Sequence, residues 1–166
     1  MAEFKSGFIS IIGRTNVGKS TLINSLVGEK VSIITNKPQT TRTAIKAIVN
    51  RENSQIIFID TPGIHKPKTK LGETMIETAF GVVPDVDIIL FLIEATSTEI
   101  GKGDRIILEK IKEANKKTIL VINKIDLVKK EELIKLIDTY SKEYDFKAVV
   151  PVSALKGKNT EIILDE

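Results

Sequence analysis

The sequence contains no cysteine, a single histidine and no long hydrophobic run. Because cysteine is absent, the chain forms no disulfide framework and offers no thiolate to a metal or a substrate, which suits a reducing cytosol. The longest apolar run lies near residues 88–93, and it is far shorter than the roughly 20 residues that a membrane-spanning helix needs. Residues 1–5 include an acid and no long apolar stretch, so we expect no signal peptide.

The composition is that of an ordinary soluble globular protein. The 166 residues suit one domain with a substantial core. Hydrophobic residues make up 42% and charged residues 28% of the sequence, as in typical globular domains. A formal charge of +3 permits contact with RNA or anionic lipid but requires neither.

Short apolar runs alternate with segments that carry apolar residues at helical spacing. The runs predict strands at residues 8–12, 43–49, 55–59, 86–93, 118–122 and 147–152, with a brief one at 31–34. The helical segments are residues 21–27, 68–83, 101–115 and 131–144, and a further helix begins at residue 159. This order predicts an α/β fold with a doubly wound, mostly parallel sheet. The turn at residues 50–54 is too short for a crossover, so its two strands should be antiparallel, and the most apolar strand, 86–93, should be central.

Residues 13–20 read GRTNVGKS, the phosphate-binding P-loop of NTPases. An apolar strand precedes the loop and a helix follows it, as the motif requires. Its glycines let backbone N–H groups turn inward around phosphates. Lys19 should reach the β- and γ-phosphates, and the Ser20 hydroxyl should ligate Mg²⁺. The predicted nucleotide-binding residues here are Gly13, Asn16, Val17, Gly18, Lys19, Ser20 and Thr21.

The sequence Asp60-Thr61-Pro62-Gly63 follows the buried strand at residues 55–59. An aspartate in that place holds Mg²⁺ in P-loop NTPases, so Asp60 is a predicted metal ligand. The Gly63 N–H should meet the γ-phosphate.

The loop at residues 37–42, before the predicted strand at 43–49, offers two threonines, Thr40 and Thr41. One of them should complete the Mg²⁺ shell when the γ-phosphate is present and should release after hydrolysis. We favour Thr41, chiefly from the family resemblance described below.

Asn123-Lys124-Ile125-Asp126 follows the strand at residues 118–122 and predicts the base that is bound. The Asp126 carboxylate can accept hydrogen bonds from guanine N1–H and the 2-amino group, both of which adenine lacks. A site built around such bonds rejects the analogue without them by a factor of about 10⁴ or more. The Lys124 stem can cover the base and Asn123 can brace neighbouring loops. A plain helix start capped by Asp126 is the alternative.

The predicted site is completed by the three residues that directly follow the last strand, Ser153, Ala154 and Leu155. Their backbone N–H groups could reach guanine O6, because the expected strand order places them beside Asn123. By themselves these three residues carry almost no signal.

Together these motifs resemble a translation-factor-class GTPase, and specifically the Era family. The matching segments are GRTNVGKST at 13–21, PQTTR at 38–42, DTPGIHKPK at 60–68, NKID at 123–126 and SALKG at 153–157. The segments PQTTR at 38–42 and GIHKPK at 63–68 separate Era from related tandem-domain and tRNA-modification GTPases. The resemblance covers nearly the whole chain. One departure is Thr15, where many relatives have proline.

The resemblance implies binding of GTP and GDP, Mg²⁺-dependent hydrolysis and a role in assembly of the small ribosomal subunit. In that family a C-terminal KH domain binds ribosomal RNA. Here residues 1–166 would form the GTPase domain alone, with a shortened last helix and without the KH domain. The resemblance further implies a monomer in the cytoplasm, with peripheral contact at the inner face of the cell membrane.

The catalytic group is the open question in this sequence. Many GTPases orient water with a glutamine after the Asp-x-x-Gly turn, but Ile64 occupies that position. His65 is a weak substitute in a turn rich in lysine and proline. In related GTPases an asparagine at the position of Asn16 helps to bind K⁺, together with the loop here at 31–36. The predicted catalytic residues are therefore Lys19, Thr41, Gly63 and Asn16.

Arg14 and Arg42 could instead stabilise the developing charge, although a place facing solvent or RNA suits both better. Three functions follow from these alternatives. The first is a GTP-hydrolysing switch. The second is a GTP-gated binding module with negligible hydrolysis of its own, which Ile64 favours. The third is another Era-related enzyme, such as a tRNA-modification GTPase.

Overall fold

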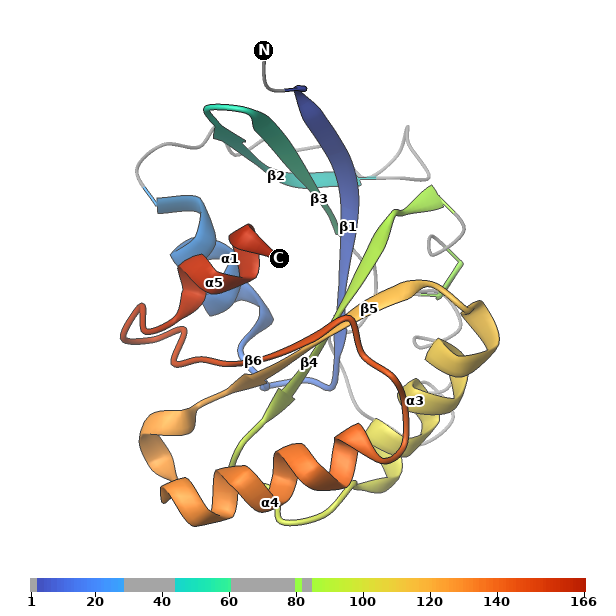
Figure 1. Cartoon of the computed structure of the whole chain (residues 1–166), viewed down its shortest axis with the longest axis vertical. Helices are drawn as coiled ribbons and strands as arrows, with labels where there is room; N and C mark the ends of the chain where they lie inside the picture. The colour runs from blue at the N-terminus through green and yellow to red at the C-terminus, as the bar shows by residue number, and fades with distance from the viewer. Residues whose placement is uncertain (1–2, 29–43, 61–79, 82–84) are drawn as a thin grey trace.

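In the part of the chain that the structure describes, the protein has three α/β layers, with one six-stranded sheet between two pairs of helices (Figure 1). The computed structural model describes residues 3–28, 44–60, 80–81 and 85–166. The sheet has the order β2-β3-β1-β4-β5-β6. Its strands are β1 (Lys5–Gly13), β2 (Ala44–Arg51), β3 (Ser54–Asp60), β4 (Ile88–Glu94), β5 (Lys117–Asn123) and β6 (Ala148–Pro151).

Strand pairing confirms the predicted mixed sheet. Only the β2–β3 hairpin is antiparallel among the paired strands described, and β1 runs parallel to both β3 and β4. The pairs β4–β5 and β5–β6 are also parallel. β1 and β4 occupy the two central places, as expected for the most apolar strand. All five residues between the ends of β4 are buried, because helices cover both faces of the sheet.

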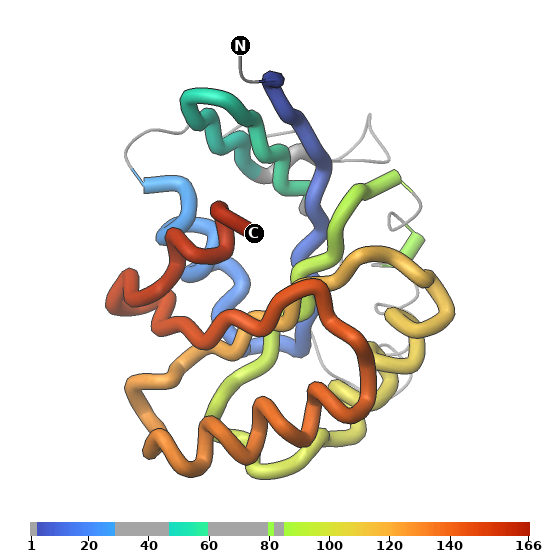
Figure 2. Tube along the Cα trace, in the orientation of Figure 1, coloured from blue at the N-terminus to red at the C-terminus, as the bar shows by residue number. Residues whose placement is uncertain are grey.

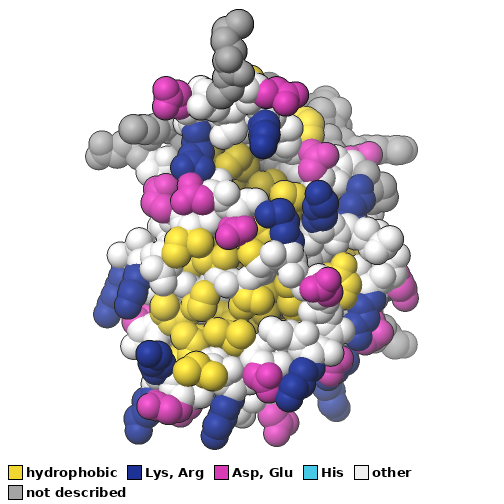
Figure 3. Space-filling view, viewed as in Figure 1, with side chains coloured by type: hydrophobic (Ala, Val, Ile, Leu, Met, Phe, Trp, Pro, Cys, Tyr) yellow, Lys and Arg dark blue, Asp and Glu magenta, His cyan; other side chains and the backbone are white. Residues whose placement is uncertain are grey.

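Side chains alternate along the central strands between two hydrophobic cores. Leu90 and Leu92 of β4 enter one core, whereas Phe91 and Ile93 enter the other. The first core lies under α1 (Lys19–Val27) and α5 (Thr160–Asp165), and the second lies under α3 (Lys102–Ala114) and α4 (Lys130–Ser141). Figure 3 shows apolar side chains gathered across the middle of the face seen in Figure 1, with charged side chains around them.

The helices begin and end where the sequence gives local reasons. Gly28 ends α1 with a φ of 51° and donates its N–H to the Asn24 carbonyl. The amphipathic helix α3 buries Ile107, Leu108 and Ile111 along one stripe. The short α5 lies beside α1 (Figure 2). The Ser25 hydroxyl of α1 donates to Thr160 Oγ1 of α5 across 3.3 Å.

Several predicted boundaries were wrong by one to three residues, among them the following three. β1 begins at Lys5, three residues earlier than expected. β4 begins at Ile88 because Asp87 turns aside, accepting the Phe8 N–H on its carboxylate and donating its own N–H to the Phe8 carbonyl. α4 ends at Ser141, since the Glu143 N–H bonds to Tyr140 O in a tighter turn.

Two expected elements, the brief strand at 31–34 and most of the helix at 68–83, lie outside the described residues. In the part of the chain that is described, no helix is long and apolar enough to cross a membrane.

Candidate nucleotide site

The P-loop connects the carboxyl end of β1 to α1, and two of its glycines are required by close contacts. A Cβ on Gly13 would lie 2.5 Å from the Leu92 carbonyl oxygen of β4. Gly18 has a φ of 101°, and a Cβ there would collide with the Asn123 side chain of β5. The motif glycines thus let the loop lie against the carboxyl ends of β4 and β5.

The P-loop side chains surround a cavity of about 470 Å³. Lys19 donates from its ammonium to the Gly13 carbonyl across 2.7 Å. Ser20 and Thr21 are exposed in the first turn of α1, where the helix dipole favours an anion. The lining residues are Thr15, Asn16, Gly18, Lys19, Ser20, Thr21 and Lys124. The structure therefore brings the predicted phosphate-binding side chains together.

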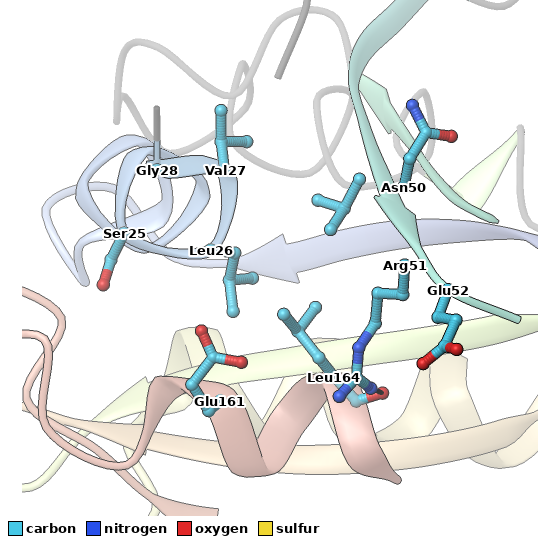
Figure 4. Close-up of a pocket in the computed structure, with 10 residues that line it drawn as sticks. Ser25, Leu26, Val27, Gly28, Asn50, Arg51, Glu52, Glu161 and Leu164 are labelled. Carbon is cyan, nitrogen blue, oxygen red and sulfur yellow. Dashed lines mark hydrogen bonds between the residues drawn. The ribbon is translucent and has the colours of Figure 1, made fainter. Parts of the chain in front are cut away.

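A larger hollow of about 590 Å³ lies at the other end of α1, between β2 and α5 (Figure 4). Its lining residues include Arg51, Glu52 and Glu161 but none of the predicted site residues that the structure describes. This hollow is larger than the P-loop cavity, but its two glutamates would repel phosphate, and the Arg51 guanidinium already bonds to the Leu164 carbonyl and to Asp165. We therefore take the P-loop cavity as the candidate nucleotide site.

Asn123 connects three loops at the carboxyl edge of the sheet. Its side-chain amide donates to the Val17 carbonyl across 2.9 Å, and its Oδ1 accepts the Ala154 N–H, also at 2.9 Å. The residue is only 3% exposed, so both bonds are shielded from water. The bracing role predicted for Asn123 is confirmed.

Lys124 ties the guanine loop to the P-loop. Its ammonium lies 2.8 Å from the Asn16 carbonyl and 2.8 Å from Glu94 Oε2 at the end of β4. Both Asn16 and Lys124 have a φ of 64°, the left-handed conformation that asparagine tolerates best among residues with side chains. Two loops more than 100 residues apart in sequence are thereby joined through one ammonium group.

Asp126 lies within a 3₁₀ helix, Ile125–Leu127, and it is exposed toward solvent. The buried Ser153 donates its hydroxyl to Asp126 Oδ1 across 2.9 Å. Asp126 makes no side-chain cap for this helix, so the alternative of a simple capping role is not what the structure shows. A carboxylate oriented by a hydroxyl is suited to receive two N–H donors from a base.

The N–H groups predicted for guanine O6 differ in their surroundings. The Ser153 N–H donates to the Lys158 carbonyl at 3.1 Å, and the Ala154 N–H is bonded to Asn123. Leu155 makes no hydrogen bond to another described residue and is 81% exposed. The sequence could not separate these three residues, because their differences come from contacts with distant loops.

Arg14 is paired with two acidic side chains, an arrangement that the sequence did not predict, and its side chain is 34% exposed. Its Nε lies 3.0 Å from Oδ1 of Asp104 in α3, and Nη2 lies 3.9 Å from Glu94 Oε1. Burial raises the pKa of Asp104, while the guanidinium of Arg14 opposes that rise. Burial, together with the nearby Asp104 carboxylate, raises the pKa of Tyr140, whose hydroxyl lies 3.4 Å from Asp104 Oδ2.

Glu94 and Asp104 were not among the predicted site residues. Glu94 could have been found, because it directly follows a buried strand, as Asp60 and Asn123 do. Asp104 carries no comparable signal, since an acidic residue in the first turn of a helix is common.

The predicted Mg²⁺ ligands are only partly described. Ser20 lies at the cavity, and Asp60 ends β3 beside β1, so both stand at the same edge of the sheet. A hydroxyl and a carboxylate are the hard oxygen ligands that Mg²⁺ prefers, and these two residue types fit the ion. Thr41, Gly63, Ile64, His65 and Arg42 lie outside the described residues, as does the loop at 31–36.

Comparison with known proteins agrees with this site. Residues 8–124 match the sequence model of a family described as 50S ribosome-binding GTPase. GTPase Era of Ruminiclostridium cellulolyticum is 51% identical over 164 residues, which cover 99% of this chain and 55% of that protein. The chain thus spans about half the length of such relatives.

Two solved structures are also similar. One is Era in complex with MgGDPNP and nucleotides 1506–1542 of 16S ribosomal RNA, at 43% identity and a TM-score of 0.79, covering 98% of this chain and 56% of that one. The other is an Aquifex aeolicus Era variant bound to GDP and AlF₄⁻, at 43% identity and a TM-score of 0.74, with the same coverage. The chain therefore belongs to the family described as 50S ribosome-binding GTPase. Its predicted resemblance to the GTPase domain of Era is confirmed.

Proposed function

We propose that this chain is the nucleotide-dependent half of a GTP switch that acts in assembly of the small ribosomal subunit. The observation that carries the proposal is the junction of the guanine loop and the P-loop, where Asn123 and Lys124 each bond to P-loop carbonyls. The loop with Asp126, proposed to select the base, is thereby joined to the loop with Lys19, proposed to bind the phosphates. GTP and GDP bind there with Mg²⁺ on Ser20, Thr41 and Asp60.

Each residue has a separate task in the proposed reaction. Lys19 exchanges its bond with the Gly13 carbonyl for phosphate oxygens. Mg²⁺, when bound, neutralises charge on the β- and γ-phosphates. Thr41 and Gly63 contact the γ-phosphate end, and Ser153, Ala154 and Leu155 line the base. Phosphate release from GTP in Mg²⁺, and its loss with EDTA, is the test, and an equal rate with ATP would overturn the guanine assignment.

We further infer that K⁺ supports hydrolysis through Asn16. Asn16 is exposed in the cavity, and its side-chain amide makes no hydrogen bond to another residue that the structure describes. A cation held there would neutralise charge between the β- and γ-phosphates. We expect faster turnover in KCl than in NaCl, with the difference lost in Asn16→Ala and retained in Asn24→Ala on the outer face of α1. Equal rates in the two salts would overturn this role.

The second candidate, a binding module with negligible hydrolysis, is favoured by the apolar Ile64 where a water-orienting glutamine is common. Single-turnover hydrolysis with and without ribosomal RNA separates the two functions. A rate indistinguishable from free GTP in both conditions would support the binding module.

The RNA partner is proposed from the relative that was solved with 16S ribosomal RNA. Because this chain spans 56% of that protein, we propose that most RNA affinity belongs to a KH domain in the full-length protein. The longer protein should bind nucleotides 1506–1542 much more tightly than residues 1–166 do. Equal affinity of both would place the RNA contacts on the GTPase domain instead.

Peripheral contact at the inner face of the cell membrane and a monomeric state complete the proposal. Vesicle flotation tests the membrane contact, and sedimentation tests the monomeric state.

A further inference from the structure

The P-loop is anchored to α3 by one partly buried ion pair. Arg14 Nε lies 3.0 Å from Asp104 Oδ1, and the side chains of the two residues are 34% and 1% exposed, respectively. Glu94 lies beside this pair, 3.9 Å from Arg14 and 2.8 Å from the Lys124 ammonium. A row of alternating charges therefore runs from the guanine loop, past the P-loop, to α3.

The surrounding chain makes room for this contact. Gly103 precedes Asp104, and a Cβ at that position would lie 2.7 Å from Arg14 Cδ. The Tyr140 hydroxyl of α4 approaches the other Asp104 oxygen at 3.4 Å. Asp104 of α3 thus contacts a residue inside the phosphate-binding motif, and Tyr140 of α4 contacts Asp104 from its other side.

Stability does not account for a carboxylate in this place. Asp104 is almost fully buried, and burial raises its pKa despite the opposing charge of Arg14. Removing an ion from water often costs more than its partner returns. The pair must therefore be explained by what it orients.

We propose that Arg14 and Asp104 are a positioning pair that holds the P-loop backbone in its phosphate-binding conformation by fixing it to α3. The loop offers N–H groups to phosphates, and these bind well only when they converge before the ligand arrives. Arg14 is the one P-loop side chain with an ion pair to α3 among the described residues. This inference rests on the phosphate site of the proposed function.

The test compares GDP dissociation with stability in Arg14→Gln, Asp104→Asn and the double variant. Dissociation is followed by displacement of a fluorescent GDP analogue from the Mg²⁺-loaded protein, and stability by urea unfolding without nucleotide. We expect each single variant to release GDP about tenfold faster or more, which corresponds to about 1.4 kcal/mol. The double variant should be no faster than the faster single variant, because both remove the same contact.

A matched control lies next along α3. Arg105 forms an ion pair with Glu143 across 2.8 Å, but neither residue touches the P-loop. Arg105→Gln should leave GDP dissociation unchanged.

Unchanged dissociation in Asp104→Asn, or additive effects in the double variant, would overturn the positioning role. If Arg14→Gln fails to fold, Arg14→Lys tests the same contact, because a point charge lacks the guanidinium geometry and should give an intermediate rate. Failure of the unsubstituted chain to bind GDP would instead overturn the proposed function.

Discussion

The groups predicted to meet the base bond to one another, whereas the Lys19 ammonium, which is predicted to meet the phosphates, bonds to the P-loop backbone. Ser153 orients Asp126, and Asn123 is bonded at both ends of its amide. On the phosphate side, the Lys19 ammonium is bonded to the Gly13 carbonyl, which a phosphate must replace.

The Asp126 carboxylate is therefore oriented before the ligand arrives, whereas the Lys19 ammonium must exchange partners when a phosphate binds. Contacts made in advance cost little ordering when a ligand binds, which favours affinity. An exchanged bond contributes only the difference between its old and new partners. Substitutions on the guanine side should therefore have the larger effects.

The largest effect is expected for Asp126→Asn. The carboxamide cannot accept both guanine N–H groups, so two charge-assisted bonds, each worth about 1.5–3 kcal/mol, are weakened or lost. We expect GDP affinity to fall about 10³-fold in a titration with fluorescent GDP. Xanthosine diphosphate should recover much of the loss, because its C2 carbonyl accepts from the new amide.

The control for this change is Asp138→Asn on the exposed part of α4, where Asp138 pairs with Lys142 at 2.8 Å. GDP affinity should not change in that variant. A loss below tenfold in Asp126→Asn would contradict the guanine assignment.

The sequence predicted this side of the site well because its signals are local. Asp126 and Asn123 follow a buried strand in a short motif, and the strand alternation alone predicted the sheet. The strand boundary at Asp87 and the end of α4 escaped prediction, since each depends on a hydrogen bond that no periodicity encodes.

Long-range partners were the least predictable part. The contact between Arg14 and Asp104 joins residues 90 positions apart, so no local pattern relates them. The same holds for Lys124, whose partner Glu94 lies on a neighbouring strand. Motifs thus single out the groups predicted to meet the ligand, but only the folded chain shows what holds those groups.

A second large effect is expected for Asn123→Ala, which breaks the connection between the two sides. The Val17 carbonyl and the Ala154 N–H both lose their side-chain partner in a buried place. Each unsatisfied group costs about 1–3 kcal/mol, so with two such groups the free energy of unfolding in urea should fall by about 2–6 kcal/mol. Asn50→Ala, at an exposed bond with Gln55, should change it by less than about 0.5 kcal/mol.

An unfolding free energy in Asn123→Ala equal to that of the parent chain would show that water replaces both bonds. The guanine side would then be no better prepared than the phosphate side.

Lys19→Ala should affect nucleotides only through their phosphates. Loss of a charged donor costs about 2–3 kcal/mol, which corresponds to a decrease in GDP affinity of roughly 30- to 150-fold. Guanosine, which carries no phosphate, should bind both forms equally weakly. An equal loss for guanosine and GDP would contradict the exchange of partners at Lys19.

The smallest effect concerns how the stability of the folded chain depends on pH through Asp104. The folded pKa of Asp104 is raised, so the folded state binds this proton more tightly than the unfolded state does. The resulting stabilisation is complete below the ordinary value of 3.8 and is lost as the pH rises through the folded pKa.

Asp104→Asn should therefore gain stability relative to the parent chain as the pH increases from about 4 to 8. Arg14 is left without its partner, but it is 34% exposed and can be solvated, so the usual penalty for an unpaired buried charge does not apply. Urea unfolding of both proteins across this range measures the difference. If Asp104→Asn lost stability relative to the parent chain as the pH rises, the ion pair with Arg14 would outweigh the cost of burying the Asp104 charge. The P-loop would then be stabilised by the same contact that positions it.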